Sequence, residues 1–509
     1  MGETCPALPS LFKPKPPHGR VEEIKMTGNK SSKKKELIAK DNFTEWYDNV
    51  LLEAKVADDR YPVKGFTVYT GWGMSIARRI IGMLEERLDN TDHDPMQFPV
   101  VIPQSSFQKE EDHIAGFSGE VFWITHAGEN ELENKLVLRP TSETAIYPMF
   151  KLWMRSHQDF PIRMQQTCNV YRYETKATRP LYRGREFLWN EGHTAHATYE
   201  DAEEQIKIAL RIYSEVYDAL GLSYIMLKRP VFDKFAGADY SVAFDTWNPD
   251  GKVNQIGTVH QLGYNFGEAF EQTFEDENGE QATAANTCYG MGFGRTLAAT
   301  IAHHGDNNGL VLPPKVAPKQ VVIVPILFRG KEEIAVGYAK ELEAKLKEAG
   351  IRVVLDSDNR TSPGDKYYKW EMYGVPLRLE VGPREAQNKN ATLVRRDNFE
   401  KIQVDEEKLV EKVNELFEAI FENLKAKDKA KLDSLVKDAY DMDQLEAYME
   451  ARLIVKVNWC GDAECAMNIK DQVSGEIRGT RWDVEEEPTG SCVFCKDEAK
   501  YVAYVSRTY

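Results

Sequence analysis

The sequence predicts an α+β protein of several domains, and three observations lead to that prediction. The patterns of segments 171–193, 234–246 and 254–266 predict strands, and residues 61–73 are also strand-like. Apolar spacing predicts helices near 43–56, 73–88 and 198–220, and Lys- and Glu-rich helices are expected at 406–450. This combination is typical of an antiparallel sheet with flanking helices. Beyond a proline-marked linker, residues 320–395 alternate between strands and helices as a βαβαβ unit, which predicts a smaller α/β domain. Two close pairs of cysteines near the C-terminus predict a third, metal-binding domain.

The chain is 509 residues long, a length typical of three or four domains. Residues 1–40 are rich in proline, glycine and lysine, so we expect a basic, disordered tail there. We expect the main domain at 41–312, the α/β domain at 318–410 and the C-terminal domain at 411–509.

Charge and composition limit the classes of function that the chain can have. The formal net charge of −16 argues against indiscriminate binding of nucleic acid, so any such contact should use a local basic surface. No run of 18 apolar residues predicts a membrane span, and the N-terminus lacks the apolar stretch of a signal peptide. Seven cysteines in so long a chain do not indicate a disulfide framework. We therefore expect a cytoplasmic protein.

The segment YRYETKATRPLYRGREFLWNEGH predicts a long hairpin with a basic loop at its tip. Arg172 lies on the first predicted strand, VYRYE, and Arg179, Arg183 and Arg185 lie in or beside the loop. The guanidinium group offers a rigid fork of donors that matches phosphate oxygens, so this arrangement suits a nucleoside triphosphate. A solvated face of surface ion pairs is the alternative interpretation, since such pairs are common.

Two further segments combine a strand with the start of a helix. In KLVLRPTSETAIYPMF, Thr141 or Ser142 can cap the helix and Glu143 suits its first turn, although capping leaves Arg139 and Glu143 beside an apolar strand unexplained. In CYGMGFGRTLAATI, Arg295 lies where a glycine-rich strand enters a helix. Backbone can approach a phosphate closely there, and a helix N-terminus favours anions. Tight strand–helix packing is the alternative explanation of the glycines.

The four C-terminal cysteines form two pairs, with four residues between Cys460 and Cys465 and two between Cys492 and Cys495. Four thiolates in two close pairs are a strong signature of a structural zinc site. Four ordinary buried cysteines are the alternative interpretation.

With these motifs identified, the sequence resembles class II aminoacyl-tRNA synthetases, specifically the prolyl-tRNA synthetases of the archaeal and eukaryotic type. FPVVIP resembles motif 1, VYRYE through REFLWNEGH resembles motif 2, and GMGFGRT resembles motif 3. RPTSE, REFLWNEGH, FAGADY and GTVHQLGYNF are more specific to the prolyl enzymes, and PGDKYYKWEMYGVPLRLEVGPRE resembles the family's anticodon-binding domain. The resemblance covers about residues 40–509. Motif 3 departs from the usual pattern at Gly294, where the family often has an acidic or small polar residue.

The resemblance implies a class II catalytic domain with an antiparallel sheet and flanking helices, then an α/β anticodon-binding domain and a C-terminal zinc-binding domain. It implies a cytoplasmic homodimer formed partly through motif 1. The implied activity is ATP-dependent ligation of L-proline to its tRNA through prolyl-adenylate, for cytosolic translation. Mg²⁺ should accompany ATP, and the zinc should be structural.

The resemblance also implies roles for individual residues. The catalytic residues are Arg172 and Arg295. The ATP-binding residues are Arg172, Glu174, Arg183, Gln255, Thr258 and Arg295. The proline-binding residues are Thr141, Glu143, Arg172, Trp189, Glu191, His193, Phe235 and His260. The anticodon-binding residues are Lys366, Arg378, Glu380 and Arg384, and the metal ligands are Cys460, Cys465, Cys492 and Cys495.

Two alternatives remain open at this point. One is a catalytically inactive, synthetase-like protein that only binds tRNA, although the presence of Arg172, Glu174 and Arg295 argues against it. The other is a class II synthetase for threonine, glycine or histidine that shares the anticodon-binding domain. REFLWNEGH and RPTSE favour proline.

Overall fold

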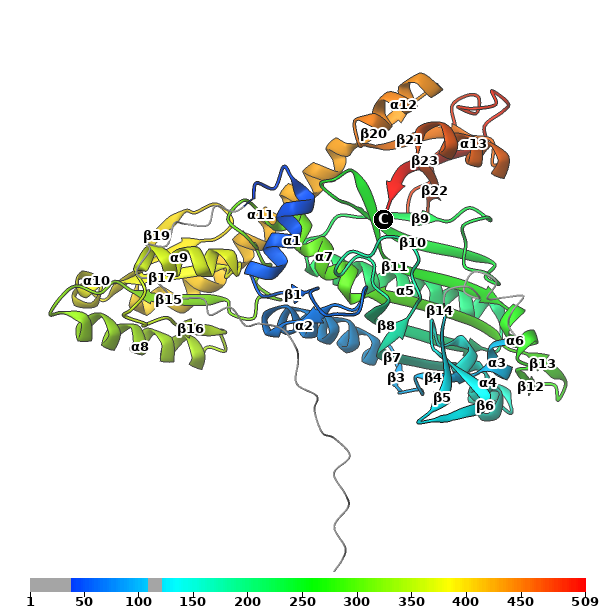
Figure 1. Ribbon diagram of the computed structural model, residues 1–509, viewed down its shortest axis with the longest axis horizontal. Helices are drawn as coiled ribbons and strands as arrows, with labels where there is room; N and C mark the ends of the chain where they lie inside the picture. Colours follow the sequence, from blue (N-terminus) through cyan, green and yellow to red (C-terminus); the bar gives the residue numbers. More distant parts are fainter. Residues whose placement is uncertain (1–37, 109–120) are drawn as a thin grey trace, which may run out of the picture. The chain divides into compact units, whose positions relative to one another are not determined.

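The computed structural model describes residues 38–108 and 121–509 (Figure 1). The basic tail expected at 1–40 therefore lies outside the described residues, apart from residues 38–40. None of the helices in the described ranges is long and apolar enough to span a membrane.

The helices within the described ranges are α1 Phe43–Glu53, α2 Gly71–Asp89, α3 Gln104–Gln108, α4 Glu143–Trp153, α5 Tyr199–Ala219, α6 Asn265–Ala269, α7 Phe293–His304, α8 Glu332–Glu348, α9 Pro363–Met372, α10 Pro383–Asn388, α11 Leu409–Leu435, α12 Met442–Glu450 and α13 Ala463–Val473. The helices predicted near 43–56, 73–88 and 198–220 are confirmed as α1, α2 and α5. Thr198 caps α5 by accepting a hydrogen bond from the backbone N–H of Asp201, as expected of a threonine at this position.

Eleven strands form the largest sheet, which is mostly antiparallel (Figure 1). In spatial order they are β20 Val436–Ala439, β21 Ile454–Trp459, β23 Tyr501–Thr508, β22 Glu476–Arg481, β9 Ile225–Lys228, β10 Tyr240–Trp247, β11 Lys252–Gly263, β14 Ala285–Gly292, β8 Glu186–His196, β7 Ile162–Tyr171 and β3 Asp94–Pro95. Helices α2, α5 and α7 cover one face of its central strands, and their apolar side chains form the main core with residues such as Phe244 and Val259.

The predicted hairpin is formed by β7 and β8, which pair from Ile162 with Ala195 to Tyr171 with Glu186. Strand β7 ends at Tyr171, so Arg172 lies one residue beyond it rather than on the strand. Its backbone N–H still donates to the carbonyl of Arg185, at 3.0 Å, which holds Arg172 at the rigid base of the loop.

Three smaller sheets complete this part of the fold. One has the order β4-β6-β5, formed by β4 Val101–Pro103, β6 Asn130–Leu138 and β5 Phe122–Ala127. The segment FPVVIP thus provides an edge strand, as its prolines predict. The other two are the pairs β1 Ala57–Asp58 with β2 Val68–Tyr69, and β12 Thr273–Glu275 with β13 Gln281–Thr283.

The α/β region contains a five-stranded sheet in the order β16-β15-β17-β18-β19. Its strands are β16 Val353–Leu355, β15 Val321–Pro325, β17 Leu377–Val381, β18 Asn390–Arg395 and β19 Lys401–Asp405. The first three are parallel, as a βαβαβ unit requires, and the last two are antiparallel. Helix α8 packs on this sheet and buries Ala335, Tyr338, Leu342 and Leu346.

The C-terminal region pairs directly with the main sheet. Strand β22 pairs with β9, and Lys252 and Val253 of β11 pair with Arg507 and Thr508 of β23. The domain boundary predicted at residue 410 lies in the first turn of α11. The helical region predicted at 406–450 is interrupted by strand β20. The C-terminal residues therefore lie beside the strands that line the cavity described below.

Two local predictions are wrong for identifiable reasons. Residues 61–73 have a strand-like sequence, but only Val68–Tyr69 form a strand, β2, because helix α2 already begins at Gly71. The helix-capping role predicted for Thr141 or Ser142 is also wrong, since Ser142 occupies the N-cap of α4 without a side-chain cap bond. Both hydroxyl groups bond to glutamate side chains instead.

Candidate active site

A cavity of about 370 Å³ lies above the central strands of the main sheet. It is lined by side chains from β8, β11, β14, the loop after β7 and the start of α7. The residues that the resemblance assigns to catalysis, proline or ATP come from segments far apart in sequence, and all of them line this one cavity: Thr141, Glu143, Arg172, Glu174, Arg183, Trp189, Glu191, His193, Phe235, Gln255, Thr258, His260 and Arg295.

Glu191 is the hydrogen-bond centre of one end of the cavity. Its carboxylate accepts from Gln166 at 2.8 Å and from the Ser142 hydroxyl, and it lies 3.0 Å from Nε2 of His193. Glu191 and His193 are two residues apart on β8, so their side chains lie on the same face of the strand. Burial opposes the charged carboxylate, but its hydrogen bond and charge interaction with His193 outweigh burial and lower the pKa of Glu191.

The pKa values of the two histidines at this end are shifted in opposite directions. Burial opposes protonation of His193, but its hydrogen bond to Glu191 and the nearby charge of Glu143 raise its pKa. Burial, together with the charges of His193 and Arg229, lowers the pKa of His260 to about 3. His260 is therefore neutral, and its Nδ1 lies 2.7 Å from the hydroxyl of Ser241.

Glu143 is the second buried carboxylate at this end, and it accepts from the Thr141 hydroxyl at 2.5 Å. Phe235 packs on the ring of His260, with 4.8 Å between ring centroids, and adds an apolar wall. The end of the cavity thus combines carboxylates with aromatic surface. This composition suits a small ring that carries an ammonium group.

Arg172 lies between this end and the arginine-rich end. Its Nε donates to the carbonyl of Pro140 at 3.0 Å, and its guanidinium group lies over the rings of Phe187 and Trp189, at 5.2 and 5.5 Å from their centroids. Stacking on aromatic faces and a bond to a backbone carbonyl restrict the fork to one orientation. Arg172 therefore lines the cavity in a restrained orientation.

Arg295, the third residue of α7, is held by two backbone carbonyls of the chain. Its Nε donates to Tyr182 at 2.9 Å and its Nη1 donates to Gln255 at 3.2 Å. Burial, and then the positive charges of Arg172 and Arg183, lower the pKa of its guanidinium group to about 10. Gly294 is required beside it, since a Cβ there would lie 2.8 Å from the carbonyl oxygen of Leu181.

Tyr509, which follows β23, packs against the loop that carries the arginines. Its ring stacks on that of Tyr182, with 4.4 Å between centroids. Its hydroxyl accepts from Arg179 at 2.8 Å and donates to Asp250 at 2.7 Å, and Arg183 donates to its backbone carbonyl. Arg183 also lies 3.5 Å from Glu174. The chain terminus thus orients two arginines beside the cavity.

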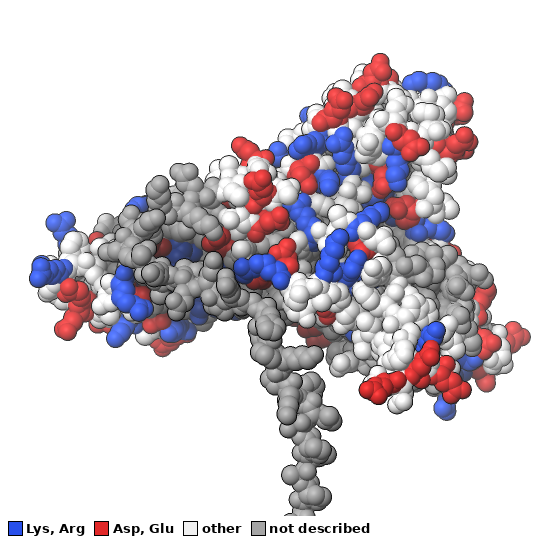
Figure 2. All heavy atoms as spheres, viewed as in Figure 1, with Lys and Arg blue, Asp and Glu red and all other residues white. Residues whose placement is uncertain are grey.

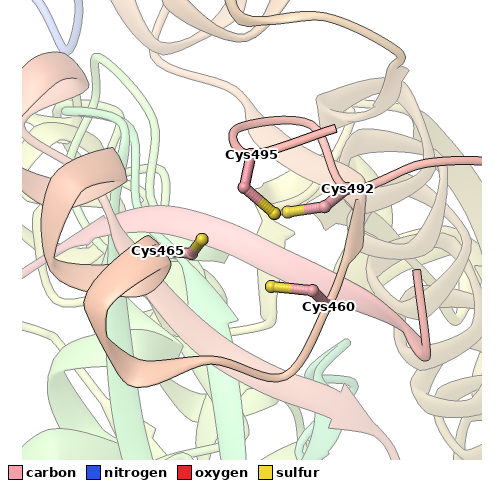
Figure 3. A group of neighbouring side chains, drawn as sticks. All are labelled: Cys460, Cys465, Cys492 and Cys495. Carbon is pink, nitrogen blue, oxygen red and sulfur yellow. The ribbon is translucent and has the colours of Figure 1, made fainter. Parts of the chain in front are cut away.

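The four predicted metal ligands lie together. The sulfur atoms of Cys460, Cys465, Cys492 and Cys495 all lie within 4.8 Å of one another and point toward a common centre (Figure 3). Tetrahedral zinc with thiolate bonds near 2.3 Å requires sulfur separations of about 3.8 Å, which this cluster can provide. The cysteines are free of disulfides, and Asp462 caps the helix that carries Cys465.

The predicted anticodon-binding residues differ in accessibility. Lys366 is buried and donates to the backbone carbonyl of Asp356 at 2.8 Å. Arg378 bonds to Glu371 and Glu380, at 2.6 and 2.9 Å. Arg384, on α10, is exposed. Figure 2 shows that basic and acidic side chains are interspersed over the face that it draws.

Sequence reasoning missed several residues of the cavity and its surroundings. Ser142 stood in a recognised motif but was interpreted as a helix cap, and the only signal for its role was its position beside Glu143. The neighbouring residues of Gln166 and Arg229 did not indicate a role for either side chain. The sequence pattern of a strand does not show which distant side chains it contacts, here Glu191 and Gln255. Tyr509 is 326 positions from Arg183, and nothing in its own segment predicts that contact.

Comparisons with known proteins agree with this architecture. Residues 122–304 match the model of the tRNA synthetase class II core domain for glycine, histidine, proline, serine and threonine, and residues 320–416 match that of the anticodon-binding domain. The mostly antiparallel sheet, the arginine-lined cavity and these two matches define the protein as a class II aminoacyl-tRNA synthetase.

The third match and the relatives identify the family. Residues 442–509 match the model of the prolyl-tRNA synthetase C-terminal domain. Curated proline--tRNA ligases of Methanosarcina mazei and Pyrococcus horikoshii are 46% and 48% identical to the chain, covering 94% and 92% of it and 99% and 98% of their own lengths. A solved Giardia lamblia prolyl-tRNA synthetase in complex with prolyl-adenylate is 36% identical, with a TM-score of 0.89, over 92% of this chain and 99% of its own. The chain belongs to the prolyl-tRNA synthetase family.

The resemblance inferred from the sequence motifs is thereby confirmed. A second solved structure, the Cryptosporidium parvum prolyl-tRNA synthetase with halofuginone and AMPPNP, is 34% identical with a TM-score of 0.89, over 93% of this chain and 99% of its own. These findings argue against both alternatives considered above, a non-enzymatic binding protein and a synthetase for another amino acid. The chain is an enzyme, a proline--tRNA ligase.

Proposed function

We propose that the cavity binds L-proline at its carboxylate-rich end and ATP at its arginine-rich end, and that Arg172 joins the two. The chain uses them to form prolyl-adenylate and then transfers proline to its tRNA. One observation carries this assignment: the thirteen residues with predicted roles in these steps line a single cavity, which contains the buried carboxylates Glu143 and Glu191 as well as Arg172, Arg183 and Arg295. That arrangement matches a cationic amine at one end and a polyphosphate at the other.

Recognition of proline rests on the two buried carboxylates. Glu191 is already hydrogen-bonded to His193, Gln166 and Ser142, so its role is to fix the positions of these three side chains. Glu143 accepts from Thr141 and presents its carboxylate to the cavity, so it receives one of the two N–H groups of the prolyl ammonium. Trp189, Phe235 and the neutral His260 surround the ring.

In the first reaction the proline carboxylate attacks the α-phosphorus of ATP, and the bond to pyrophosphate breaks. No protein nucleophile is required, so catalysis depends on positioning and on stabilising charge. Arg172 touches both the carboxylate and the α-phosphate, and Arg295 and Arg183 hold the outer phosphates. Glu174 receives the adenine amino group, while Gln255 and Thr258 face the ribose and phosphates.

Mg²⁺ is the proposed companion of ATP. The phosphates would supply most of its ligands, and the carboxylate of Glu186, which also lines the cavity, is of the kind that Mg²⁺ accepts. The ion would neutralise charge on the departing pyrophosphate.

The second reaction requires tRNA, and we propose that the five-stranded domain binds its anticodon. Arg384 is the proposed direct contact, because it is exposed, whereas Lys366, Arg378 and Glu380 hold the domain in shape through their internal bonds. We place this reaction in the cytoplasm, in support of translation.

We propose a homodimer formed through the β4 edge. Val100, which precedes this strand, and Leu152 and Trp153 of helix α4 are exposed apolar side chains. Apolar surface at a sheet edge marks an interaction site. Sedimentation of a Leu152→Glu and Trp153→Glu double variant as a monomer, against a wild-type dimer, supports this interface. A wild-type monomer contradicts it.

We also propose that the four clustered cysteines hold one structural zinc ion. Four thiolates leave no open coordination position, so the ion would stabilise the C-terminal region without taking part in the reaction. Elemental analysis of the purified protein should give one zinc per chain, and Cys492→Ser should reduce this to nearly none. Metal-free protein with four freely titratable thiols contradicts the assignment.

Amino-acid-dependent exchange of pyrophosphate into ATP tests the proposed activity. Proline should support exchange, whereas threonine, glycine and histidine should support almost none. Charging of tRNA for proline then tests the second reaction. Exchange with another amino acid in preference to proline would overturn the assignment of the pocket.

A further inference from the structure

A β-bulge in the C-terminal region directs an arginine toward the main sheet. In the pairing of β22 with β23, Ile477 is opposite Val505 and Gly479 is opposite Tyr504, so Arg478 is the additional residue. A bulge rotates the side chain of its extra residue away from the regular alternation of the strand. Arg478 is thereby turned toward β9 and β10 and is only 7% exposed.

Close backbone contact holds this bulge in place. Gly479 has a φ of +131°, and a Cβ added there would lie 2.1 Å from the carbonyl oxygen of Lys228. Only glycine therefore permits β22 to lie this close to the end of β9. The contact sits immediately before Arg229, the residue that Arg478 meets.

Arg478 and Arg229 share one buried carboxylate, that of Asp245. Arg478 Nε donates to Asp245 Oδ2 at 3.0 Å, and Arg229 donates to both carboxylate oxygens, at 3.0 and 2.6 Å. Arg229 also donates to the backbone carbonyl of Arg478 at 2.7 Å. The side chains of Arg229 and Asp245 are 3% and 2% exposed. Asp233 lies 3.8 Å from both arginines, and Glu476 lies 3.5 Å from Arg478.

The network continues into the cavity through Gln255. Arg229 Nη2 donates to the side-chain oxygen of Gln255 at 2.8 Å, and the backbone carbonyl of Gln255 accepts from Arg295. Because the amide oxygen of Gln255 faces Arg229, its two N–H donors remain for a ligand oxygen. Arg229, Gln255 and Arg295 all line the cavity.

We infer that Arg478 is a positioning residue for the nucleotide: it orients Arg229 through Asp245, and Arg229 presents the amide of Gln255 to an oxygen of ATP. Without Arg478, the Asp245 carboxylate loses one of its two cationic partners, and Arg229 alone must neutralise it. If the guanidinium group of Arg229 shifts toward Asp245, its hydrogen bond to the side-chain amide of Gln255 is weakened, and the amide is no longer held in one orientation. This inference rests on the proposed binding of ATP beside Gln255 and Arg295.

The test compares Arg478→Met with Arg481→Met in the full-length enzyme. Arg481 lies on the same strand, but it bonds to Asp483 at 2.7 Å on the outer surface, so it is a matched control. Pyrophosphate exchange should show that Arg478→Met raises KM for ATP about tenfold, with KM for proline within twofold of wild type. Arg481→Met should leave both constants within twofold.

A double variant separates positioning from a general structural effect. If Arg478 acts through Gln255, Arg478→Met should raise KM for ATP less than twofold in a Gln255→Ala background. Full additivity, or an equal rise in KM for ATP and for proline in Arg478→Met, overturns the inference.

Arg478→Lys serves if Arg478→Met fails to fold. It restores one charge-assisted bond to Asp245, so KM for ATP should rise about threefold. If Arg478→Lys folds and its KM for ATP equals that of the wild type, the inference is overturned. Absence of proline-dependent exchange by the wild-type enzyme would instead contradict the proposed function.

Discussion

The two ends of the cavity differ in how their charged groups are paired. At the proline end, the buried Glu191 is hydrogen-bonded to His193 and Ser142. At the nucleotide end, the positive charges of Arg172 and Arg183 repel that of Arg295. At the proline end, the lowered pKa of Glu191 and the raised pKa of His193 favour an ion pair between them before any substrate binds. At the nucleotide end, Nε of Arg183 is buried without a hydrogen-bond partner among the described residues.

The difference reflects the charge of the two substrates. Proline brings one ammonium and one carboxylate, so a nearly neutral, pre-bonded site can select it by shape and by a few donors. ATP brings several negative charges, and a site with surplus cations becomes favourable only when the phosphates are present. We therefore expect substitutions at the two ends to change different kinetic constants.

Arg172→Ala should have the largest effect, because this residue joins the two ends. Losing a contact that strengthens in the transition state should lower kcat for pyrophosphate exchange on the order of 10²- to 10³-fold. Arg211→Ala, on the outer face of α5 with a side chain 61% exposed, is the control and should be unchanged. Near-normal exchange by folded Arg172→Ala would remove this residue from the mechanism.

Glu191→Gln should affect the proline end alone. The amide keeps the shape of the side chain but removes the charge that faces His193, so KM for proline should rise about ten- to a hundredfold. KM for ATP should stay within a factor of a few. A rise in KM for ATP as large as that for proline would show that the two ends are not independent.

Tyr509→Phe should affect the nucleotide end, by less. The change removes the hydroxyl that links Arg179 to Asp250 but keeps the ring that stacks on Tyr182. We expect KM for ATP to rise roughly threefold to tenfold, as for loss of one hydrogen bond to a charged group. Tyr501→Phe, whose ring is 47% exposed, is the control. A change in KM for proline alone would contradict the assignment.

The smallest expected effect is a pH dependence of stability that comes from the proline end. The pKa of His193 is raised above 6.5 in the folded protein, so its contribution to the free energy of unfolding is complete below pH 6.5. That contribution falls as pH rises through the folded pKa, by at most about 1.4 kcal/mol per pH unit. Thermal midpoints of wild type and His193→Gln should therefore converge as the pH rises above 6.5. A gap that widens with pH would give the shift the wrong sign.

Much of the site was predictable because its signals are local. Trp189, Glu191 and His193 alternate along one strand, and the twofold period of a strand places alternate side chains on one face. Arg295 was predictable because a glycine-rich strand entering a helix is an anion-binding arrangement. The cysteine pairs likewise carry their meaning in their spacing.

The roles of Ser142, Lys366 and Tyr509 were decided by tertiary structure. A serine before a helix reads as a cap, but at this position the nearest strong acceptor is Glu191, which is 49 residues away in sequence. Lys366 reads as a surface cation, yet packing of α9 buries it against Asp356.

The sequence by itself therefore determined the family, the helices and strands that carry motifs, and the side chains that share a strand face or a helix start. These properties follow from backbone periodicity and from donor chemistry within a few residues. Only the tertiary structure decided that β22 and β23 pair with the main sheet, bringing Arg478 and Tyr509 to strands and loops more than 200 residues earlier in the chain. Such contacts depend on which sheet edges meet, and a strand's local pattern is the same whichever edge it joins.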